Sequence, residues 1–252
     1  MEEIIKTANL KKVYGLDTPY PKTALNGVSI SVNKGTFACI MGTSGSGKTT
    51  LINILSTIDE ATSGKLLIFD QNIVGLSDKE KANIRKRYMG FIFQDYNLLD
   101  NMTLQDNIAL PLSLNGKRSR EIIEKTKQMA SLFGLSEHLN KYPYQLSGGQ
   151  KQRGASARAL ITNPRIIFAD EPTGALDSKS SKDLLISLKK ANESGNATIL
   201  MVTHDAYSAS YAKQVYMLSD GAIKCRLNHS GERQKFYDEI LSLLASMGSE
   251  QE

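Results

Sequence analysis

The segment "GTSGSGKTT", residues 42–50, carries the strongest structural signal in this sequence. Gly42, Gly47, Lys48 and Thr49 satisfy the pattern G-x-x-x-x-G-K-[ST], and the continuous apolar run "TFACIM" at 36–41 comes directly before it. Such a run predicts a strand that is buried on both faces, and a helix is predicted from residue 49 to about 58. A strand, a glycine loop and a helix in this order form a cradle for phosphate, because backbone N–H groups and the helix N-terminus both attract anions.

The residue types of this loop suit a nucleotide with its magnesium ion. Lys48 is expected to reach the β- and γ-phosphates, and the Thr49 hydroxyl is expected to ligate Mg²⁺. An ordinary glycine–serine turn is the alternative, and the strand–loop–helix context argues against it. The loop residues predicted to bind the nucleotide are Gly42, Ser44, Gly45, Gly47, Lys48, Thr49 and Thr50.

The rest of the chain alternates apolar strands with helical segments. Short strands are predicted at 65–69, 89–93, 166–169 and 198–203. Helices are predicted after Ser77, which has capping-box spacing to Glu80, from Ser119 as N-cap to Gly134 as C-cap, and after Ser178 up to Gly195. Because right-handed crossovers join strands that alternate with helices, this pattern predicts an α/β fold with a mostly parallel sheet.

Two segments depart from this pattern. "LNGVSISV" at 25–32 alternates apolar and polar residues, which predicts a single antiparallel strand. The predicted hairpin "VYMLSDGAIKC" at 215–225 leads to a tail for which a helix that covers the domain is favoured over a docking surface. One face of this helix would carry Phe236, Ile240, Leu243, Leu244 and Met247.

Polar side chains follow three of the predicted strands. Asp170 and Glu171 end "IIFADE", His204 follows "TILMVT", and Gln94 follows "MGFIF". Parallel sheets carry ligand groups at the carboxyl ends of their strands, so Asp170 is expected to bind Mg²⁺, directly or through water, and Glu171 to act as general base on the attacking water. His204 is expected to contact the γ-phosphate, and Gln94 to reach Mg²⁺ or the water. Each of these polar residues, taken alone, would be interpreted as an ordinary strand end or loop residue. Together with the phosphate loop they predict a hydrolytic site.

The expected nucleotide is ATP. The guanine-reading tetrad N-K-x-D does not occur in the sequence, whereas Tyr14 in "KKVYG" is suited to stack on a purine, with an ordinary exposed or core tyrosine as an equal alternative. The 31 Lys and Arg exceed the 26 Asp and Glu by only five, which is weak evidence for nucleic acid. Cys39 and Cys225 lack metal-ligand spacing and are expected to be small core residues.

A second glycine pair lies far from the phosphate loop, in "QLSGGQKQR" at 145–153. Ser147, Gly148 and Gly149 would present a hydroxyl and bare N–H groups at a helix N-terminus, which makes a second anion site. Residues 42–50 already hold the nucleotide of their own chain. We therefore predict a head-to-tail pair of chains, in which this segment of one subunit closes on the γ-phosphate that the other subunit holds.

These segments resemble, in order and spacing, the motifs of the ATP-binding cassette ATPases. The resemblance covers about residues 3–225 and rests on residues 42–50, Gln94, "LSGGQ" at 146–150, "IIFADE" at 166–171, "GALD" at 174–177 and His204. It implies a P-loop NTPase (RecA-like) core with an antiparallel β-subdomain and an inserted α-helical subdomain at about 95–160. We thus expect an ATPase domain at 1–225 and a helical tail at 226–252. Gly174 departs from the many family members that have serine there.

The resemblance also implies roles for single residues. Tyr14 would stack on adenine, Gln94 would sense Mg²⁺ and couple to a partner, and His204 would act as a switch. The residues implied to act across the interface of a homodimer are Ser147, Gly148, Gly149, Gln150 and Asp177.

A narrower resemblance concerns the transported substrate. "FIFQDYNLLDNMTLQDNIALPL", "ADEPTGALDSKSSKDLL" and "MVTHD" are similar to lipoprotein-release, macrolide-export and cell-division ATPases, and "FQDYNLLD", "ALDSKS" and "ERQKFYDEIL" resemble bacitracin-type antimicrobial-peptide resistance transporters. This implies a separate membrane permease with a large extracellular domain, which in such systems commonly works beside a two-component sensor kinase. The chain would then be cytoplasmic, on the inner face of the cell membrane.

Alternatives remain open at this point. A complex that signals without moving a substrate would share every motif. A soluble cassette ATPase acting on DNA or ribosomes is disfavoured because the sequence lacks a long coiled-coil insertion, a zinc-binding cysteine cluster and a second cassette. For a transporter, the permease is expected to dock after Gln94, around residues 96–108, where Leu98 and Leu99 should be needed for transport but not for ATP binding.

Overall fold

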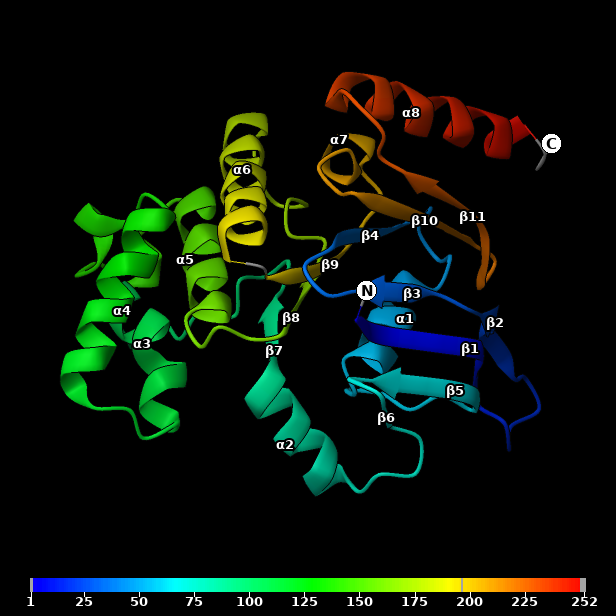
Figure 1. Ribbon diagram of the computed structural model, residues 1–252, viewed down its shortest axis with the longest axis horizontal. Coiled ribbons are helices and arrows are strands. Elements are labelled where there is room, and N and C mark those ends of the chain that lie inside the picture. The colour runs from blue at the N-terminus through cyan, green and yellow to red at the C-terminus, as the bar shows by residue number, and fades with distance from the viewer. Residues whose placement is uncertain (1, 196, 250–252) are drawn as a thin grey trace.

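The computed structural model describes residues 2–195 and 197–249, and its central layer is a six-stranded sheet in the order β11-β10-β4-β9-β8-β7 (Figure 1). Every neighbouring pair in this sheet is parallel except β10 with β11, which confirms the predicted α/β class. The strands are β4 (Phe37–Met41), β7 (Met89–Ile92), β8 (Ile166–Asp170), β9 (Thr198–Thr203), β10 (Gln214–Ser219) and β11 (Ala222–Asn228).

Strand β4 is buried on both faces, as its continuous apolar sequence predicts. Phe37, Cys39 and Met41 enter one hydrophobic core, and Ala38 and Ile40 enter the other. The second core also contains α1 (Lys48–Leu55) and α2 (Asp78–Tyr88). The first contains α5 (Gly148–Leu160), α6 (Ser178–Gly195), α7 (Ala206–Ala209) and α8 (Arg233–Ser249).

A second, antiparallel sheet contains β1 (Glu3–Tyr14), β2 (Lys22–Val28), β3 (Ser31–Asn33), β5 (Ser63–Ile68) and β6 (Gln71–Asn72). The prediction of one strand at 25–32 is therefore wrong, because the chain breaks between β2 and β3 while both pair with β1. The Thr7 side chain occupies this break: its Oγ1 donates to the Val28 carbonyl at 3.0 Å and accepts from the Ile30 N–H at 2.9 Å. Strand β1 itself was not predicted.

Helices α3 (Leu104–Leu114), α4 (Ser119–Leu132) and α5 lie together on one side of the molecule, drawn in green in Figure 1, and two short 3-10 helices, η1 (Ser136–His138) and η2 (Pro143–Gln145), connect α4 to α5. The proposed N-cap of α4 is wrong, because Arg118 holds the extended cap conformation and Ser119 is already helical. Gly134 follows the C-cap Phe133 with φ of 62°, the left-handed conformation that glycine adopts readily.

Local chemistry sets other element ends. Helix α2 begins with the predicted capping box of Ser77 and Glu80. Helix α1 ends at Leu55, three residues before the expected position, since Thr57 has φ of 62° and cannot continue a right-handed helix. Asp220 and Gly221 both have positive φ between β10 and β11, which suits a two-residue hairpin turn.

The C-terminal helix α8 packs beside α7 and the sheet (Figure 1). Phe236 and Ile240 are buried in the first core, and Leu243, Leu244 and Met247 pack against it, which confirms the predicted helix face. In the described part of the chain no helix has both the length and the apolar character that a membrane crossing requires.

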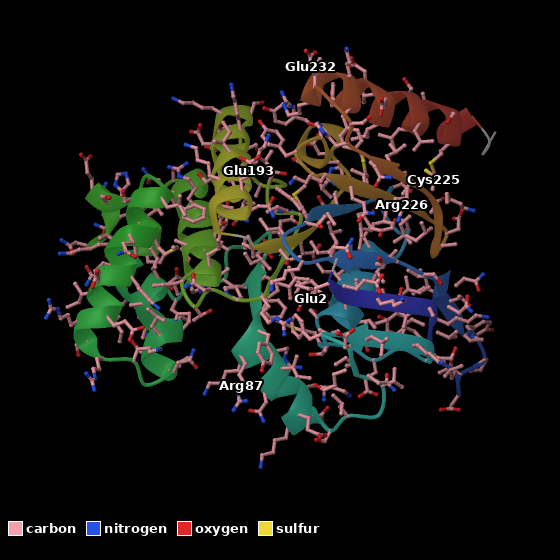
Figure 2. The ribbon with its side chains drawn as sticks, viewed as in Figure 1. Glu2, Arg87, Glu193, Cys225, Arg226 and Glu232 are labelled. Atoms are coloured by element: carbon pink, nitrogen blue, oxygen red, sulfur yellow. The ribbon has the colours of Figure 1, made fainter. Side chains whose placement is uncertain are left out.

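Both cysteines are free thiols. Cys39 is fully buried in β4, as predicted, while Cys225 lies half-buried on β11 (Figure 2). Burial raises the pKa of both thiols, so they stay protonated at neutral pH.

Candidate active site

The loop between β4 and α1 requires glycine at two of its predicted positions. A Cβ at Gly42 would lie 2.2 Å from the Leu218 carbonyl oxygen, and a Cβ at Gly47 would lie 2.5 Å from the Ala24 carbonyl oxygen. Gly47 also has φ of 103°, which disfavours any other residue. Strands β2 and β10 therefore pack so closely against the loop that no side chain fits at Gly42 or Gly47.

Lys48 opens α1 and is almost completely buried. Its Nζ donates to the carbonyls of Gly42 at 2.9 Å and Thr43 at 2.8 Å, so the ammonium lies across the loop. The first turn of α1 contains no acidic residue, and Gly47 at the N-cap leaves its N–H groups without a side-chain acceptor. Partial positive charge and a cation thus coincide at the place predicted for phosphate.

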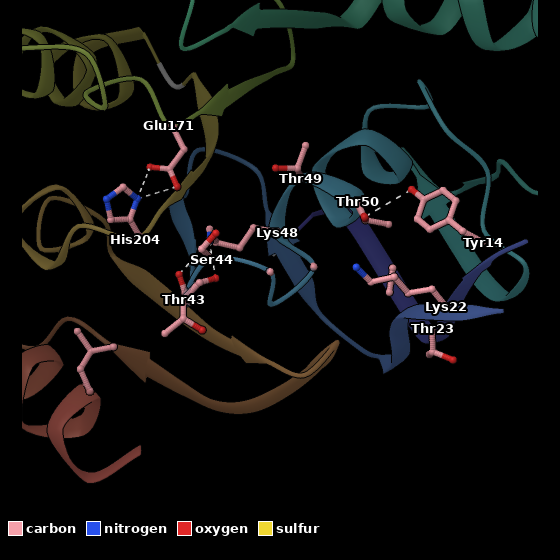
Figure 3. Close-up of a pocket in the computed structure, with 15 residues that line it drawn as sticks. Tyr14, Lys22, Thr23, Thr43, Ser44, Lys48, Thr49, Thr50, Glu171 and His204 are labelled. Carbon is pink, nitrogen blue, oxygen red and sulfur yellow. Dashed lines mark hydrogen bonds and ion pairs between the residues drawn. The ribbon is translucent and has the colours of Figure 1, made fainter. Parts of the chain in front are cut away.

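Strand register brings the predicted hydrolytic residues to the same sheet edge. Met41 of β4 pairs with Thr203 of β9, and Val202 of β9 pairs with Asp170 of β8. Since these strands are parallel, the phosphate loop, Glu171 and His204 all leave the sheet at this edge (Figure 3).

Asp170 has the properties of a cation ligand. Its Oδ1 is buried and has no hydrogen-bond partner among the described residues. Burial and the neighbouring Glu171 carboxylate raise the pKa of Asp170, and the positive charge of Lys48 opposes this shift. A bound cation would compensate the buried charge, so the site fits Mg²⁺.

Glu171 is held by groups from β9. The Thr203 hydroxyl donates to its Oε2 at 3.2 Å, and His204 Nδ1 lies 3.0 Å from the carboxylate (Figure 3). The Glu171 N–H continues the strand ladder to the Val202 carbonyl at 2.9 Å. Its φ of 45° is uncommon for a residue other than glycine and turns the chain sharply after β8.

A cavity of about 790 Å³ joins these groups. Tyr14, Thr49, Thr50, Glu171 and His204 line it together with the loop glycines and Ser44. Tyr14 lies at its rim, 42% exposed, and donates its hydroxyl to Asp59 at 2.8 Å. The predicted nucleotide-binding residues of the phosphate loop are therefore brought together with the predicted base and with Tyr14. A volume of this size suits a nucleotide.

Gln94 is exposed two residues beyond β7 and does not line this cavity. Its Nε2 lies 3.1 Å from where a Cβ at Gly174 would be. The Gln94 amide therefore lies beside Gly174, the position at which the chain departs from the family pattern.

The second glycine segment starts α5, away from the cavity of its own chain. Ser147 and Gln150 form a reciprocal capping box, with the Gln150 N–H donating to Ser147 Oγ at 3.3 Å and the Ser147 N–H to Gln150 Oε1 at 2.9 Å. Gly149 packs against α6, because a Cβ there would lie 2.5 Å from Ser180 Oγ. The predicted helix N-terminus is confirmed, whereas its binding role stays a prediction.

Asp177 caps α6 instead of pointing freely into solvent. It accepts from the Ser180 N–H at 2.9 Å and from the Ser180 hydroxyl at 2.7 Å, and these hydrogen bonds lower the pKa of Asp177. Ser180 also contacts the Gly149 position, so this cap links α6 to the second glycine segment.

Several lining residues were not predicted. Lys22, Thr23 and Ala24 reach the cavity from β2, and Leu244 reaches it from α8. Thr203 was overlooked too, because it was taken as an ordinary last residue of the predicted strand "TILMVT". No periodic signal marks β2 or α8 as walls of this site, because only the tertiary fold brings them there.

The fold and this site define the chain as a P-loop nucleotide triphosphatase. The family model described as ABC transporter matches residues 25–174. The bacitracin export ATP-binding protein BceA of Halalkalibacterium halodurans is 48% identical over 249 residues, 98% of this chain and 98% of that protein. The chain belongs to the ABC transporter family and is the type of subunit that binds and hydrolyses ATP.

Three further comparisons bear on assembly. The macrolide export ATP-binding/permease protein MacB of Syntrophobacter fumaroxidans is 43% identical over 88% of this chain but only 31% of that protein. The dimeric structure of MJ0796, a bacterial ABC transporter cassette, has a TM-score of 0.83 and 38% identity, covering 90% of this chain and 100% of that one. A dimeric post-hydrolysis state of the same cassette bound to ADP and Pi has a TM-score of 0.82.

Proposed function

We propose that this ATPase is the energy-coupling subunit of a transporter for resistance to antimicrobial peptides, and that it drives a separate membrane permease from the cytoplasmic side. The observation that carries the ATPase part is the Glu171 carboxylate, held by Thr203 and His204 in the cavity that also contains Lys48. The peptide substrate is supported by the similarity to the bacitracin export protein over nearly the whole chain.

We infer the following roles for the residues of the site. Thr49, Asp170 and Gln94 would hold Mg²⁺, which neutralises phosphate charge when bound. Glu171 would take a proton from the attacking water, or orient that water, while Lys48 and the loop N–H groups bind the phosphates. In the same scheme His204 orients the γ-phosphate and Tyr14 stacks on adenine.

Two copies would form a head-to-tail homodimer around ATP. Ser147 to Gln150 and Asp177 lie outside the nucleotide cavity of their own chain, which supports a role across a subunit interface. The dimeric cassette relatives support the same arrangement. ATP would close the dimer, and its hydrolysis would release it.

The loop after Gln94 is the surface that we propose for the permease. Leu99 is 41% exposed, and Asn107 fixes its backbone by accepting the Leu99 N–H at 2.7 Å and donating to the Leu99 carbonyl at 3.0 Å. Beside it, Arg158 donates to the Tyr96 carbonyl at 3.0 Å and lines a cavity of about 580 Å³. Apolar side chains dominate this cavity: Met89, Phe91, Phe93, Leu110, Pro111 and Leu114.

Leu99→Asp tests this surface, with Ile123→Asp as a matched control on the exposed face of α4. We expect Leu99→Asp to lose co-purification with the permease from membranes and to lose peptide resistance, while its ATP affinity is unchanged. Loss of ATP binding in Leu99→Asp, or an equal effect of Ile123→Asp, would contradict the assignment. A two-component sensor kinase that binds through the permease would appear in the same co-purification.

The hydrolytic function is tested with Glu171→Gln, and Glu193→Gln serves as control because Glu193 lies exposed on α6 (Figure 2). Glu171→Gln should bind ATP with unchanged affinity and lose at least about a hundredfold in kcat. Glu193→Gln should hydrolyse ATP at the unchanged rate. Undiminished hydrolysis by Glu171→Gln would refute Glu171 as the base.

A further inference from the structure

The hydroxyl of Thr203 is a buried donor to the Glu171 carboxylate. Thr203 is the last residue of β9, is fully buried, and lies 3.2 Å from Glu171 Oε2 through its Oγ1. His204 approaches the same carboxylate but is itself exposed. Among the described residues, the Thr203 and His204 side chains are the polar partners of the Glu171 carboxylate, and Thr203 is the one that packing fixes in place.

The direction of the Thr203 hydroxyl is determined by its other partner. The Asp205 N–H donates to Thr203 Oγ1 at 3.1 Å. A hydroxyl has one proton and two acceptor sites, so accepting from Asp205 leaves the Thr203 proton for the carboxylate. Backbone geometry at the end of β9 thus directs this proton toward Glu171.

A chain of hydrogen bonds continues from Asp205 to the segment that carries Glu171. Asp205 Oδ2 accepts from the Ser208 N–H at 2.9 Å and from the Ser208 hydroxyl at 2.6 Å. Ser208 Oγ in turn lies 2.9 Å from Thr173 Oγ1, two residues after Glu171. Ser208 is fully buried and Thr173 nearly so, whereas Asp205 between Thr203 and Ser208 is half-buried.

The backbone of Glu171 makes such support necessary. Its left-handed φ of 45° is intrinsically unfavourable, and such conformations persist only where the surrounding contacts hold them. The Val202 carbonyl holds the backbone through the Glu171 N–H, and Thr203 holds the side chain. Consecutive residues of β9 therefore fix both parts of Glu171.

We propose that Thr203 is a positioning residue for ATP hydrolysis, whose hydroxyl, oriented by Asp205, aims the Glu171 carboxylate at the attacking water. This inference rests on the proposed role of Glu171 as base. Thr203 itself touches neither phosphate nor water in this scheme, and it acts only through Glu171. Its loss should lower the rate of the chemical step without weakening ATP binding.

The test compares Thr203→Val, which keeps the side-chain shape, with Thr203→Ser, which keeps the hydroxyl. Thr198→Val is the matched control, because Thr198 is equally buried on the same strand and its Oγ1 accepts a backbone N–H, that of Gly35, at 3.0 Å. Steady-state kcat and KM for Mg-ATP are measured for each variant together with Tm, and Glu171→Gln is assayed in parallel.

We expect Thr203→Val to lose about ten- to a hundredfold in kcat, the range for a hydrogen bond to a charged group, with KM within about twofold. Thr203→Ser should recover kcat to within about threefold, since the hydroxyl donor is retained. Thr198→Val should lower Tm and leave kcat unchanged.

Undiminished kcat in Thr203→Val overturns the proposal. So does a rise in KM at constant kcat, or an equal loss of kcat in Thr198→Val, which would mark a merely structural effect. If Glu171→Gln is inactive while Thr203→Val is fully active, only the role of Thr203 falls. If Glu171→Gln hydrolyses ATP normally, the proposed base and the proposed role of Thr203 fall together.

Discussion

His204 Nδ1 lies 3.0 Å from the carboxylate of Glu171, across the carboxyl ends of the paired strands β8 and β9. The contact follows from strand register: Asp170 is opposite Val202, so the residues just beyond the two strands meet. His204, which is expected at the γ-phosphate, thus contacts Glu171, the expected base. A substitution of either residue should therefore alter the position of the other.

His204→Ala tests this coupling. It removes the imidazole that lies against the Glu171 carboxylate, and we expect kcat to fall about a hundredfold while ATP affinity stays within about threefold. His229→Ala is the control, because His229 packs against Phe236 at 4.9 Å and does not line the nucleotide cavity. Steady-state hydrolysis and equilibrium ATP binding measure both quantities. An active His204→Ala protein would show that the contact is dispensable.

The phosphate loop should tolerate alanine at Gly45 far better than at Gly42. A Cβ at Gly42 would meet the Leu218 carbonyl oxygen at 2.2 Å, whereas a Cβ at Gly45 meets no atom within 4 Å and carries only the strain of φ 81°. We expect Gly42→Ala to lose more than about 3 kcal/mol of unfolding free energy and Gly45→Ala about 1 kcal/mol, as measured by denaturant titration. Equal losses would contradict the packing of β10 against the loop.

Asp170 should make the stability of the nucleotide-free protein depend on pH. Burial and Glu171 raise its pKa, so the folded state disfavours the ionised form and stability is lost as pH rises through that raised pKa. Asp170→Asn should therefore raise Tm at neutral and alkaline pH, and the gain should shrink as pH falls toward the ordinary aspartate pKa of 3.8.

Two controls complete this prediction. Asp100→Asn, at an exposed position, should leave Tm unchanged at every pH. Mg-ATP should stabilise Asp170→Asn less than the unchanged protein, because a proposed magnesium ligand is lost. A Tm gain that is independent of pH would show that charge burial is not its cause.

Arg233 should anchor the C-terminal helix. Its guanidinium lies 5.0 Å from the Tyr207 ring and 4.8 Å from the Tyr211 ring, and it donates to Ser210 Oγ at 3.0 Å. We expect Arg233→Met to lower the free energy of unfolding by about 1–2 kcal/mol. Tm should fall by about 2–4 °C for each kcal/mol lost, and proteolysis of α8 should become faster. Lys235→Met, at an exposed position of the same helix, should change neither quantity.

The central features of the site were predictable because their signals are local. An apolar run, a glycine loop and a helix predict the phosphate cradle, and parallel strands bring Asp170, Glu171 and His204 to one edge. Strand β1 was missed because its pattern is broken: Asn9 has φ of 49° and the register shifts beside it. The Thr7 contacts that divide β2 from β3 join residues distant in sequence, so no window of sequence reveals them.

Contacts between distant elements also explain the unpredicted part of the site. Leu244 reaches the nucleotide cavity only because α8 folds back along the sheet. Its place in the helical pattern indicates a buried face but not what that face covers. Thr203 was missed for the same reason, since it is an ordinary strand residue in the sequence. Only the β8–β9 register makes it a hydrogen-bond partner of Glu171.

Ser147 to Gln150 are proposed to complete the ATP site of a second copy of the chain. We would measure molar mass by size-exclusion chromatography with light scattering on Glu171→Gln protein, with and without Mg-ATP. The same measurement is made with Ser147→Arg added and, as control, with Ser131→Arg, at an exposed position on α4. We expect an ATP-dependent dimer that Ser147→Arg abolishes and Ser131→Arg preserves. A protein that stays monomeric with ATP demonstrably bound, or a dimer indifferent to Ser147→Arg, would contradict it.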